Sequence, residues 1–254
     1  MDEPVLLTGA GGHVGQVILE RLGDKYDWRL LYHSQPAEEP NHPYVTGEVQ
    51  DPADVRPAME GAGAVVHLAG DPRPEAPWDS VLPNNIDGTH TIYDLAVQEG
   101  VDRVVFASSN HAVGAAETDK RTPDIYRSED DFRLDGTEYP RPGNKYGISK
   151  ATGEIIGRYY HDTYGISVCN IRIGNLNEEY PPVDYDRGQA MWLSPRDCAQ
   201  IHDRALRADY GFEIVYGISD NDSKYYSIER AREVLGYEPQ DNAAEWDGTE
   251  KLSE

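Results

Sequence analysis

The chain has 254 residues, enough for one substantial hydrophobic core, and its apolar runs all fall well short of the roughly 20 residues of a membrane span. Its 46 acidic and 23 basic residues give a formal net charge of −23, which argues against nucleic acid as a partner because phosphate backbones need a basic face. Its two cysteines, Cys169 and Cys198, form no CxxC pair or Cys/His cluster, so we expect neither a metal site nor a disulfide framework.

Short β-branched runs alternate with helix-length segments along the chain, which is typical of a parallel sheet with helices on both faces. The predicted strands are Pro4–Thr8, Trp28–Tyr32, Pro43–Gly47, Ala64–Leu68, Arg103–Ser108, Val168–Ile173 and Glu213–Tyr216. The predicted helices are Gly12–Leu22, Pro52–Met59, Trp78–Glu99, Lys145–Tyr164, Pro195–Ala208 and Ile228–Leu235. This order predicts an α/β fold with a Rossmann-type, doubly wound parallel sheet.

We expect a single domain over residues 1–254, because no segment has the composition of an interdomain linker. Its Rossmann core would span about residues 3–175 and 213–218, and a small C-terminal substrate-binding part would use segments of about 176–212 and 219–246. Two stretches, Ala115–Gly143 and Asn177–Gly188, fit neither helix nor strand. Loops of this length in a compact domain are typical of lids, substrate walls or disordered segments.

A glycine-rich turn joins the first predicted strand to the first predicted helix. Gly9, Gly12 and Gly15 have the spacing G-x-x-G-x-x-G, with His13 and Val14 between the last two. Such a turn lets backbone N–H groups and a helix N-terminus approach a pyrophosphate, because glycines permit a tight path and close contact. Since the strand–turn–helix context is present, the turn predicts a dinucleotide site.

The end of the second strand normally distinguishes the two nicotinamide dinucleotides, because an Asp or Glu there holds the adenosine ribose of NAD. This chain has Tyr32 at that place, followed by His33 and Ser34, so neither the acid nor a 2′-phosphate-binding arginine is present. The acidity of the chain, including Glu48 nearby in sequence, disfavours an extra phosphate. We therefore expect NAD and leave NADP open.

Tyr146 and Lys150 are four residues apart at the start of a predicted helix, so one helical turn places them on the same face. An ammonium beside a phenol stabilises the phenolate and lowers its pKa toward the range of a general base. Ser109 follows the fifth predicted strand and can donate a hydrogen bond to a reacting oxygen. Asn110 and His111 come next and border the substrate in this interpretation, although His111 is as readily a structural histidine.

These motifs together resemble the extended short-chain dehydrogenase/reductases, over nearly the whole chain. The resemblance rests on Thr8–Gly15, Asn85, Ser109, and Tyr146 with Lys150. It implies that Ser109 orients the substrate hydroxyl, that Tyr146 is the general base, and that Lys150 holds the nicotinamide ribose while acidifying Tyr146. Asn85 would help to position the lysine or the cofactor. The implied cofactor-binding set is Gly9, Gly12, His13, Val14, Gly15, Tyr32, Glu48, Val49, Leu68, Ala69, Gly70, Asn85, Ala107, Tyr146, Lys150 and Ile173.

Longer motifs resemble two kinds of sugar dehydrogenase within this family. Four stretches are similar to uronate dehydrogenases, which oxidise the C1 hydroxyl of a sugar acid to a lactone: Val104–His111, Ile171–Asn175, Arg187 with Met191–Ser194, and Val215–Ser219. Gly70–Trp78 and Asp220–Tyr226 are similar to the NAD-dependent glucose-6-phosphate dehydrogenases of halophilic archaea. The resemblance implies oxidation of glucose 6-phosphate at C1 to 6-phosphogluconolactone. A uronate or another aldose is the alternative substrate, and a sugar epimerase is the second alternative function.

A small anionic sugar requires local positive charge in so acidic a protein. Arg73 follows the fourth strand and Arg187 lies in the loop after the sixth, so either suits a phosphate or a carboxylate, and either is also compatible with a solvated surface charge. Trp192 fits equally a ring stacked on a sugar face and a core residue. The predicted substrate-binding residues are Arg73, Ser109, Asn110, His111, Asn175, Arg187 and Trp192.

Function classes other than a dehydrogenase share this fold. An epimerase would recycle its bound cofactor, whereas a non-catalytic dinucleotide sensor would commonly lack the Tyr/Lys pair that this chain keeps.

The family resemblance also implies a homodimer through the helices corresponding to Trp78–Glu99 and Lys145–Tyr164. Only six of the 23 basic residues are lysines, and the first strand begins almost at Met1, which leaves no room for a signal peptide. We therefore expect a halophilic, cytoplasmic enzyme without a membrane partner, although an acidic enzyme of ordinary salt tolerance has the same composition.

Overall fold

A computed structural model describes residues 3–118, 134–176 and 186–245 of the chain. Seven parallel strands form one sheet in the order β3-β2-β1-β4-β5-β6-β9. They are β1 (Val5–Thr8), β2 (Trp28–Tyr32), β3 (Tyr44–Thr46), β4 (Ala64–His67), β5 (Arg103–Ser109), β6 (Ser167–Ile173) and β9 (Phe212–Gly217). The doubly wound sheet predicted from the sequence is confirmed, and each predicted strand is present to within one residue at either end.

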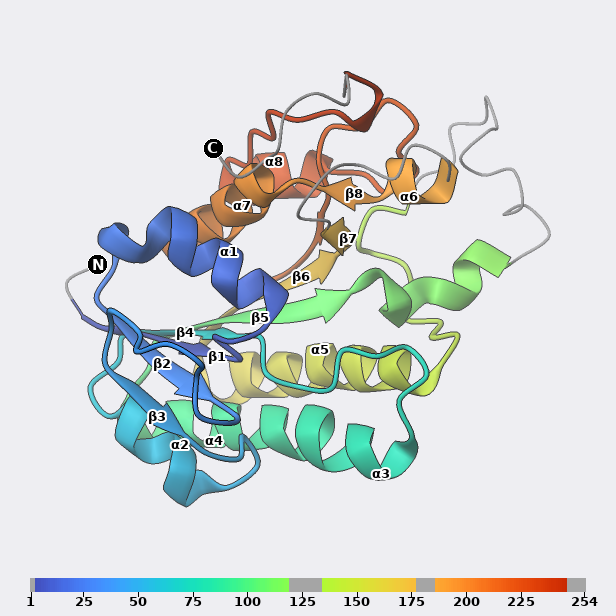
Figure 1. Cartoon of the computed structure of the whole chain (residues 1–254). Helices are drawn as coiled ribbons and strands as arrows, with labels where there is room; N and C mark the ends of the chain where they lie inside the picture. The colour runs from blue at the N-terminus through green and yellow to red at the C-terminus, as the bar shows by residue number, and fades with distance from the viewer. Residues whose placement is uncertain (1–2, 119–133, 177–185, 246–254) are drawn as a thin grey trace.

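Helices cover both faces of the sheet (Figure 1). On one face pack α1 (His13–Leu22), α7 (Pro195–Arg207) and α8 (Glu229–Leu235), and on the other α2 (Pro52–Met59), α4 (Gly88–Glu99) and α5 (Lys145–Tyr164). Because both faces are covered, β1 and β4 at the centre of the sheet are buried at every residue, and each is apolar except for its last residue, Thr8 or His67. Two hydrophobic cores result, one on each side of the sheet.

The predicted helix Trp78–Glu99 is interrupted. It consists of α3 (Trp78–Val81), a π-helical turn called η2 (Leu82–Asp87), and α4. Pro83 accounts for the break, because proline has no backbone N–H and its ring clashes with the carbonyl one turn earlier in a regular α-helix. The wider π-turn accommodates this ring, and it carries the buried side chain of Asn85.

Several short elements lie where the sequence predicts no helix or strand. They are η1 (Gly23–Lys25), η3 (Asn110–Thr118), β7 (Asn175–Leu176), α6 (Asp186–Ala190), β8 (Trp192–Leu193) and η4 (Ala243–Glu245). The loop predicted at Asn177–Gly188 is therefore wrong at its C-terminal end, where α6 begins. Residues 177–185 of that loop, and residues 119–133 of the loop predicted at Ala115–Gly143, lie outside the described residues.

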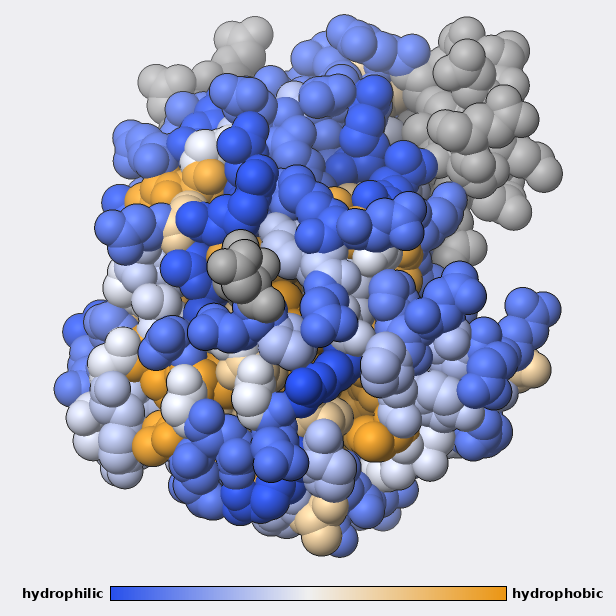
Figure 2. Space-filling view, turned by 90° about the vertical axis from the view of Figure 1, so that its left-hand side faces the viewer, coloured by the Kyte–Doolittle hydropathy of each residue, from blue (hydrophilic) through white to orange (hydrophobic). Residues whose placement is uncertain are grey.

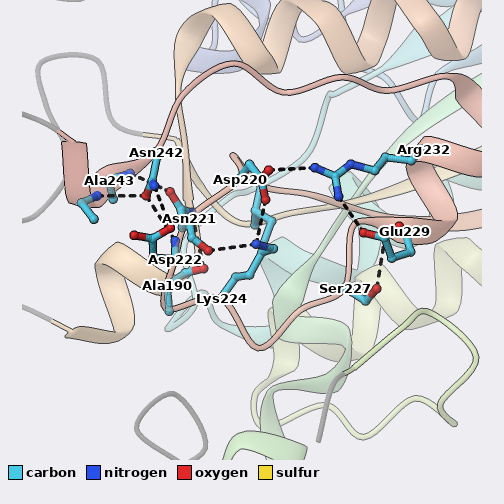
Figure 3. A network of polar contacts seen from close by, with 12 residues as sticks. Ala190, Asp220, Asn221, Asp222, Lys224, Ser227, Glu229, Arg232, Asn242 and Ala243 are labelled. Carbon is cyan, nitrogen blue, oxygen red and sulfur yellow. Dashed lines mark hydrogen bonds and ion pairs between the residues drawn. The ribbon is translucent and has the colours of Figure 1, made fainter. Parts of the chain in front are cut away.

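The C-terminal part is tied to β8 by the buried side chain of Asn221 (Figure 3). Its amide nitrogen donates to the carbonyls of Trp192 (2.9 Å) and Ala190 (3.5 Å), and its amide oxygen accepts from the backbone N–H of Ala243 (3.0 Å). Asp220 beside it pairs with Lys224 and Arg232. These contacts fix the segment that follows β9 against the turn that leads from α6 into β8.

The surface at the amino ends of the strands is dominated by hydrophilic residues, with apolar residues confined to small patches between them (Figure 2). This distribution agrees with the large excess of acidic residues in the sequence. Within the described ranges, no helix has the length and the apolar character that crossing a membrane requires.

Candidate active site

A cavity of about 640 Å³ opens at the carboxyl ends of β1, β2, β4 and β5. This is where the strand order reverses around β1, the position at which doubly wound sheets bind ligands. Of the predicted cofactor-binding residues, those that line it are Gly9, Gly12, His13, Val14, Gly15, Tyr32, Glu48, Val49, Leu68, Ala69, Gly70, Ala107, Tyr146, Lys150 and Ile173. Lining residues that the sequence did not assign to the site are Gly11, Leu31, His33, Ser34, Gly47, Asp71, Pro72, Ser80, Asn84, Ser108 and Gly174. Most of these residues are next in sequence to a predicted site residue, and this proximity is the signal by which they could have been assigned to the site.

The glycine-rich turn closes the cavity at β1. Gly9 has a positive φ of 70°, and a Cβ there would lie 2.8 Å from the backbone nitrogen of Ala69. A Cβ at Gly15 would lie 2.7 Å from the carbonyl oxygen of Gly9, so a larger residue at either place would force the turn apart. Gly12 caps α1 without a side chain, which leaves the first helical amides for a pyrophosphate.

The wall beyond β2 is aromatic where a ribose-binding acid is usual. A Cβ at Gly11 would lie 3.1 Å from the ring of Tyr32, and this ring meets Tyr44 edge to face with centroids 6.0 Å apart. The acid at this wall is Glu48, which comes from the segment after β3 and lies 3.2 Å from the ring nitrogen of His33. An acidic oxygen is thus present at this end of the cavity although β2 does not supply it.

Tyr146 and Lys150 lie in the first two turns of α5, which begins at a side-chain cap: Asn144 accepts from the backbone N–H of Gly147 at 2.7 Å. The Nζ of Lys150 donates to the carbonyl of Ala107 at 2.7 Å and lies 5.6 Å from the centre of the Tyr146 ring. Ser109 at the end of β5 lines the same cavity. The structure therefore brings the three predicted catalytic residues together.

Burial sets the charges of this group. It lowers the pKa of Lys150 from 10.5 to about 8, because the ammonium loses its water. Burial raises the pKa of Tyr146, and a hydrogen bond with Ser109 opposes that shift. Without a ligand the phenol is therefore protonated at neutral pH, and the ammonium of Lys150 beside it is the group that favours its ionisation.

Asn85 lies behind the wall of the cavity. Its amide oxygen accepts from the backbone N–H of Asp71 (2.7 Å), while its amide nitrogen donates to the carbonyl of Asp71 (3.0 Å) and to the hydroxyl of Ser149 (3.1 Å). Ser149 in turn donates to the carbonyl of Tyr146 at 2.7 Å. Asn85 thus connects the loop after β4 to the first turn of α5 and acts on the site through its neighbours.

A second cavity of about 270 Å³ adjoins the first, and Ser109 and Tyr146 line both. Its remaining walls include the predicted substrate residues Asn110, His111, Asn175 and Arg187. It is also lined by Pro72, Pro74, Gly174, Gly188 and Met191, which the sequence did not assign to the site.

The ring of His111 lies against Tyr146. It meets the ring of Tyr146 edge to face with centroids 5.6 Å apart. The Nδ1 of His111 accepts from the amide of Asn144 at 2.9 Å, because the oxygen of that amide is engaged with Gly147. The neutral ring of His111 accordingly carries its proton on Nε2.

Two predicted substrate residues lie elsewhere. Arg73 is exposed and pairs with Asp71, with Nη2 to Oδ2 at 2.6 Å and Nε to Oδ1 at 2.9 Å, and this pairing holds the pKa of Asp71 well below its usual range. Trp192 is only 1% exposed, so its ring belongs to the core and cannot stack on a sugar without rearrangement. Across the described parts of the chain, no group of three or more His, Cys, Asp or Glu side chains is placed to hold a metal ion.

The chain belongs to the NAD dependent epimerase/dehydratase family, whose model matches residues 5–204. It is 63% identical to the NAD-dependent glucose-6-phosphate dehydrogenase of Haloferax volcanii, over 97% of this chain and 96% of that protein. It is 36% identical to the uronate dehydrogenase of Pseudomonas putida, over 94% of this chain and 84% of that protein. Among solved structures, a mutant of the uronate dehydrogenase from Agrobacterium tumefaciens, complexed with NAD, superposes with a TM-score of 0.81 at 30% identity, covering 95% and 86% of the two chains.

Replacing Tyr146 by Phe removes the hydroxyl and keeps the ring. We expect turnover to fall by at least about 100-fold, as for loss of a general base, while the affinity for NADH changes little. Steady-state kinetics and NADH fluorescence titration measure the two effects. Retention of near-full turnover would show that another group takes the proton.

The lowered pKa of Lys150 predicts a pH-dependent stability. Between about pH 8 and 10.5 the unfolded chain holds a proton that folded Lys150 has released, so raising the pH through this window favours the folded state. From about pH 7 to 9.5, the wild type should therefore gain on the order of 2 kcal/mol in free energy of unfolding relative to Lys150→Met. Denaturant unfolding at both pH values measures this, with exposed Lys145→Met as the control. A constant difference between wild type and Lys150→Met would contradict the prediction.

Proposed function

We propose that this chain catalyses the NAD-dependent oxidation of the C1 hydroxyl of glucose 6-phosphate to 6-phosphogluconolactone. The observation that carries the proposal is the 63% identity to the Haloferax volcanii enzyme over nearly the full length of both chains. The cavities support it, because Ser109 and Tyr146 line both the dinucleotide cavity and the smaller one beside it. The smaller cavity falls just below the range of about 300–1,000 Å³ of drug-sized ligand sites, which suits a monosaccharide better than a nucleotide sugar.

In the proposed reaction, Tyr146 takes the proton of the C1 hydroxyl of the sugar. Bound NAD would supply the acceptor for the hydride of C1 and, at its pyridinium ring, a positive charge. Ser109 donates a hydrogen bond to the reacting oxygen and orients it. Lys150, whose carbonyl contact to Ala107 fixes its position, stabilises the phenolate form of Tyr146 and holds the nicotinamide ribose.

The substrate anion is the second requirement. Arg187 lines the smaller cavity, whereas Arg73 lines neither cavity, so we assign the phosphate to Arg187. A guanidinium suits this role because it offers several donors in a fixed plane. A uronate carboxylate would bind the same group, which makes a uronate dehydrogenase the alternative function. In this proposal the predicted segment of about 176–212 contributes Arg187, Gly188 and Met191 to the sugar site, whereas the described residues of the predicted segment 219–246 line neither cavity.

A substrate series with matched arginine variants tests the proposal. With glucose 6-phosphate, glucose, glucuronate and galacturonate against NAD and NADP at molar salt, we expect glucose 6-phosphate and NAD to give the highest kcat/KM. Arg187→Ala should raise the KM for glucose 6-phosphate at least about tenfold and leave that for glucose nearly unchanged, because only the phosphate loses its partner. Arg73→Ala should change neither KM. Preferential oxidation of a uronate would replace the proposed substrate, and interconversion of sugars without NADH release would indicate an epimerase.

We also propose that the enzyme is a homodimer in a salt-rich cytoplasm. Ile148, Ile155 and Tyr159 form an exposed apolar stripe on α5, and Trp78 and Leu82 are exposed on the neighbouring α3 and η2. A second copy would cover this surface, which corresponds to the helices through which the family commonly dimerises. The acidic, lysine-poor surface suits high salt, where self-repulsion is screened.

Sedimentation velocity at molar salt tests the dimer. We expect the wild type to sediment as a dimer and Ile155→Glu to sediment as a monomer, because a charge in an apolar interface is costly. Tyr139→Glu is the control, since Tyr139 is also highly exposed but lies outside the α5 stripe. A monomeric wild type, or an Ile155→Glu dimer, would rule out this interface.

A further inference from the structure

His67 is a completely buried histidine at the end of β4, and it does not line either cavity. Its Nδ1 lies 2.8 Å from the hydroxyl of Thr8 at the end of β1. Its Nε2 lies 3.0 Å from the hydroxyl of Thr89 in α4. The side chain thus bridges the strand that enters the glycine-rich turn and the helix that follows the π-turn.

The partners of Thr89 fix the direction of these hydrogen bonds. Thr89 donates its only hydroxyl proton to the carbonyl of Asn85 at 2.6 Å, so it can only accept from His67. The Nε2 of His67 therefore carries the proton. Nδ1 must then accept, and it accepts from Thr8. A neutral ring meets both requirements, and burial together with the charge of Lys150 lowers the pKa of His67 to about 3, which keeps the ring neutral.

The chain of contacts reaches the cofactor cavity at one end. The hydroxyl oxygen of Thr8 accepts from the backbone N–H groups of Leu68 and Ala69, each at 3.2 Å. Both residues line the cavity. Because Thr8 gives its proton to His67, both of its lone pairs remain for these two amides. The loop after β4 is thereby held against the end of β1.

At its other end, this series of hydrogen bonds reaches α5. Asn85, whose carbonyl accepts from Thr89, clamps Asp71 through its side chain and donates to Ser149, which donates to the carbonyl of Tyr146. Each hydroxyl in this series has one proton and one acceptor for it. The series joins the dinucleotide half of the site to the first turn of α5.

We propose that His67 is a positioning residue for the dehydrogenase reaction: through Thr8 and Thr89 it holds the loop Leu68–Gly70, Asn85 and the Tyr146 turn in one arrangement around the cofactor. It touches neither substrate nor cofactor and acts only through these neighbours. The expected change in kcat/KM rests on the proposed dehydrogenase function. The positioning of the loop, Asn85 and the Tyr146 turn rests on the hydrogen bonds alone.

The matched pair Thr89→Val and Thr89→Ser tests the proposal with little change of shape. Valine removes the hydroxyl that His67 needs, whereas serine keeps it. We expect Thr89→Val to lower kcat/KM for NAD about tenfold, with a higher KM for NAD and a KM for sugar within about twofold of wild type. Thr89→Ser should restore the wild-type values. Tyr210→Phe is the control, because it also removes a buried hydroxyl that donates to a backbone carbonyl, that of Ala205, and neither residue lines a cavity.

Three further measurements separate positioning from packing. The NADH dissociation constant should rise for Thr89→Val and not for Tyr210→Phe, a result that stands even if glucose 6-phosphate proves not to be the substrate. Nitrogen-15 NMR of the ring should show His67 protonated at Nε2. In His67→Asn and His67→Gln, the side-chain amide replaces one of the two ring nitrogens. The NADH affinity of each variant should therefore lie between that of the wild type and that of His67→Leu. The proposal would be overturned if the kinetics and NADH affinity of Thr89→Val equalled those of Tyr210→Phe, or if the ring proton of His67 were on Nδ1.

Discussion

The register of the parallel sheet is the constraint on which the site depends. Thr8 pairs with His67 across β1 and β4, and His67 pairs with Phe106 across β4 and β5, so β1 and β4 end in one row while β5 continues to Ser109. Both faces of the sheet are buried, and shifting one strand by a residue would turn all of its side chains to the opposite face. The same register places Ser109 opposite Ile173 at the border of the cavity. Backbone pairing therefore positions Ser109, whereas Tyr146 and Lys150 are brought to it by α5.

Two buried cations in the same region are compensated in different ways. Arg172, completely buried in β6, forms a double contact with Glu154 of α5 at 2.8 and 2.9 Å, and it also pairs with Glu138. Ser108 donates to Glu154 at 2.6 Å, so this ion pair anchors α5 to β5 beside the proposed catalytic residues. Lys150 has the carbonyl of Ala107 and no carboxylate among the partners described for it. A fully paired cation such as Arg172 stabilises the framework, whereas an ammonium without a counter-ion remains available to a phenolate.

Much of the fold and part of the site follow from the sequence, because short-range signals encode them. The periodicity of apolar residues, the helix-capping residues and the positions of glycines predicted all seven strands of the sheet. They also predicted α5 from Lys145 to Tyr164 residue for residue. The spacing of Tyr146 and Lys150 needed only the geometry of one helical turn. What the sequence could not supply was long-range: the burial of Trp192, the pairing of Arg73 with Asp71, and the π-turn through which Asn85 reaches Ser149. Pro83 was a visible signal for that turn, yet a proline predicts a break in a helix and not its geometry.

The aromatic wall at Tyr32 has a consequence for work at high ionic strength. At 1 M salt the Debye length is about 3 Å, so recognition that depends on exposed charges loses most of its reach. The contact of the Tyr32 ring with Gly11, and its packing against Tyr44, involve no net charge. Apolar burial is strengthened, not screened, by salts that are excluded from the protein surface. The Tyr32 ring therefore gives the cofactor cavity a boundary whose shape and contacts are retained at high salt concentration.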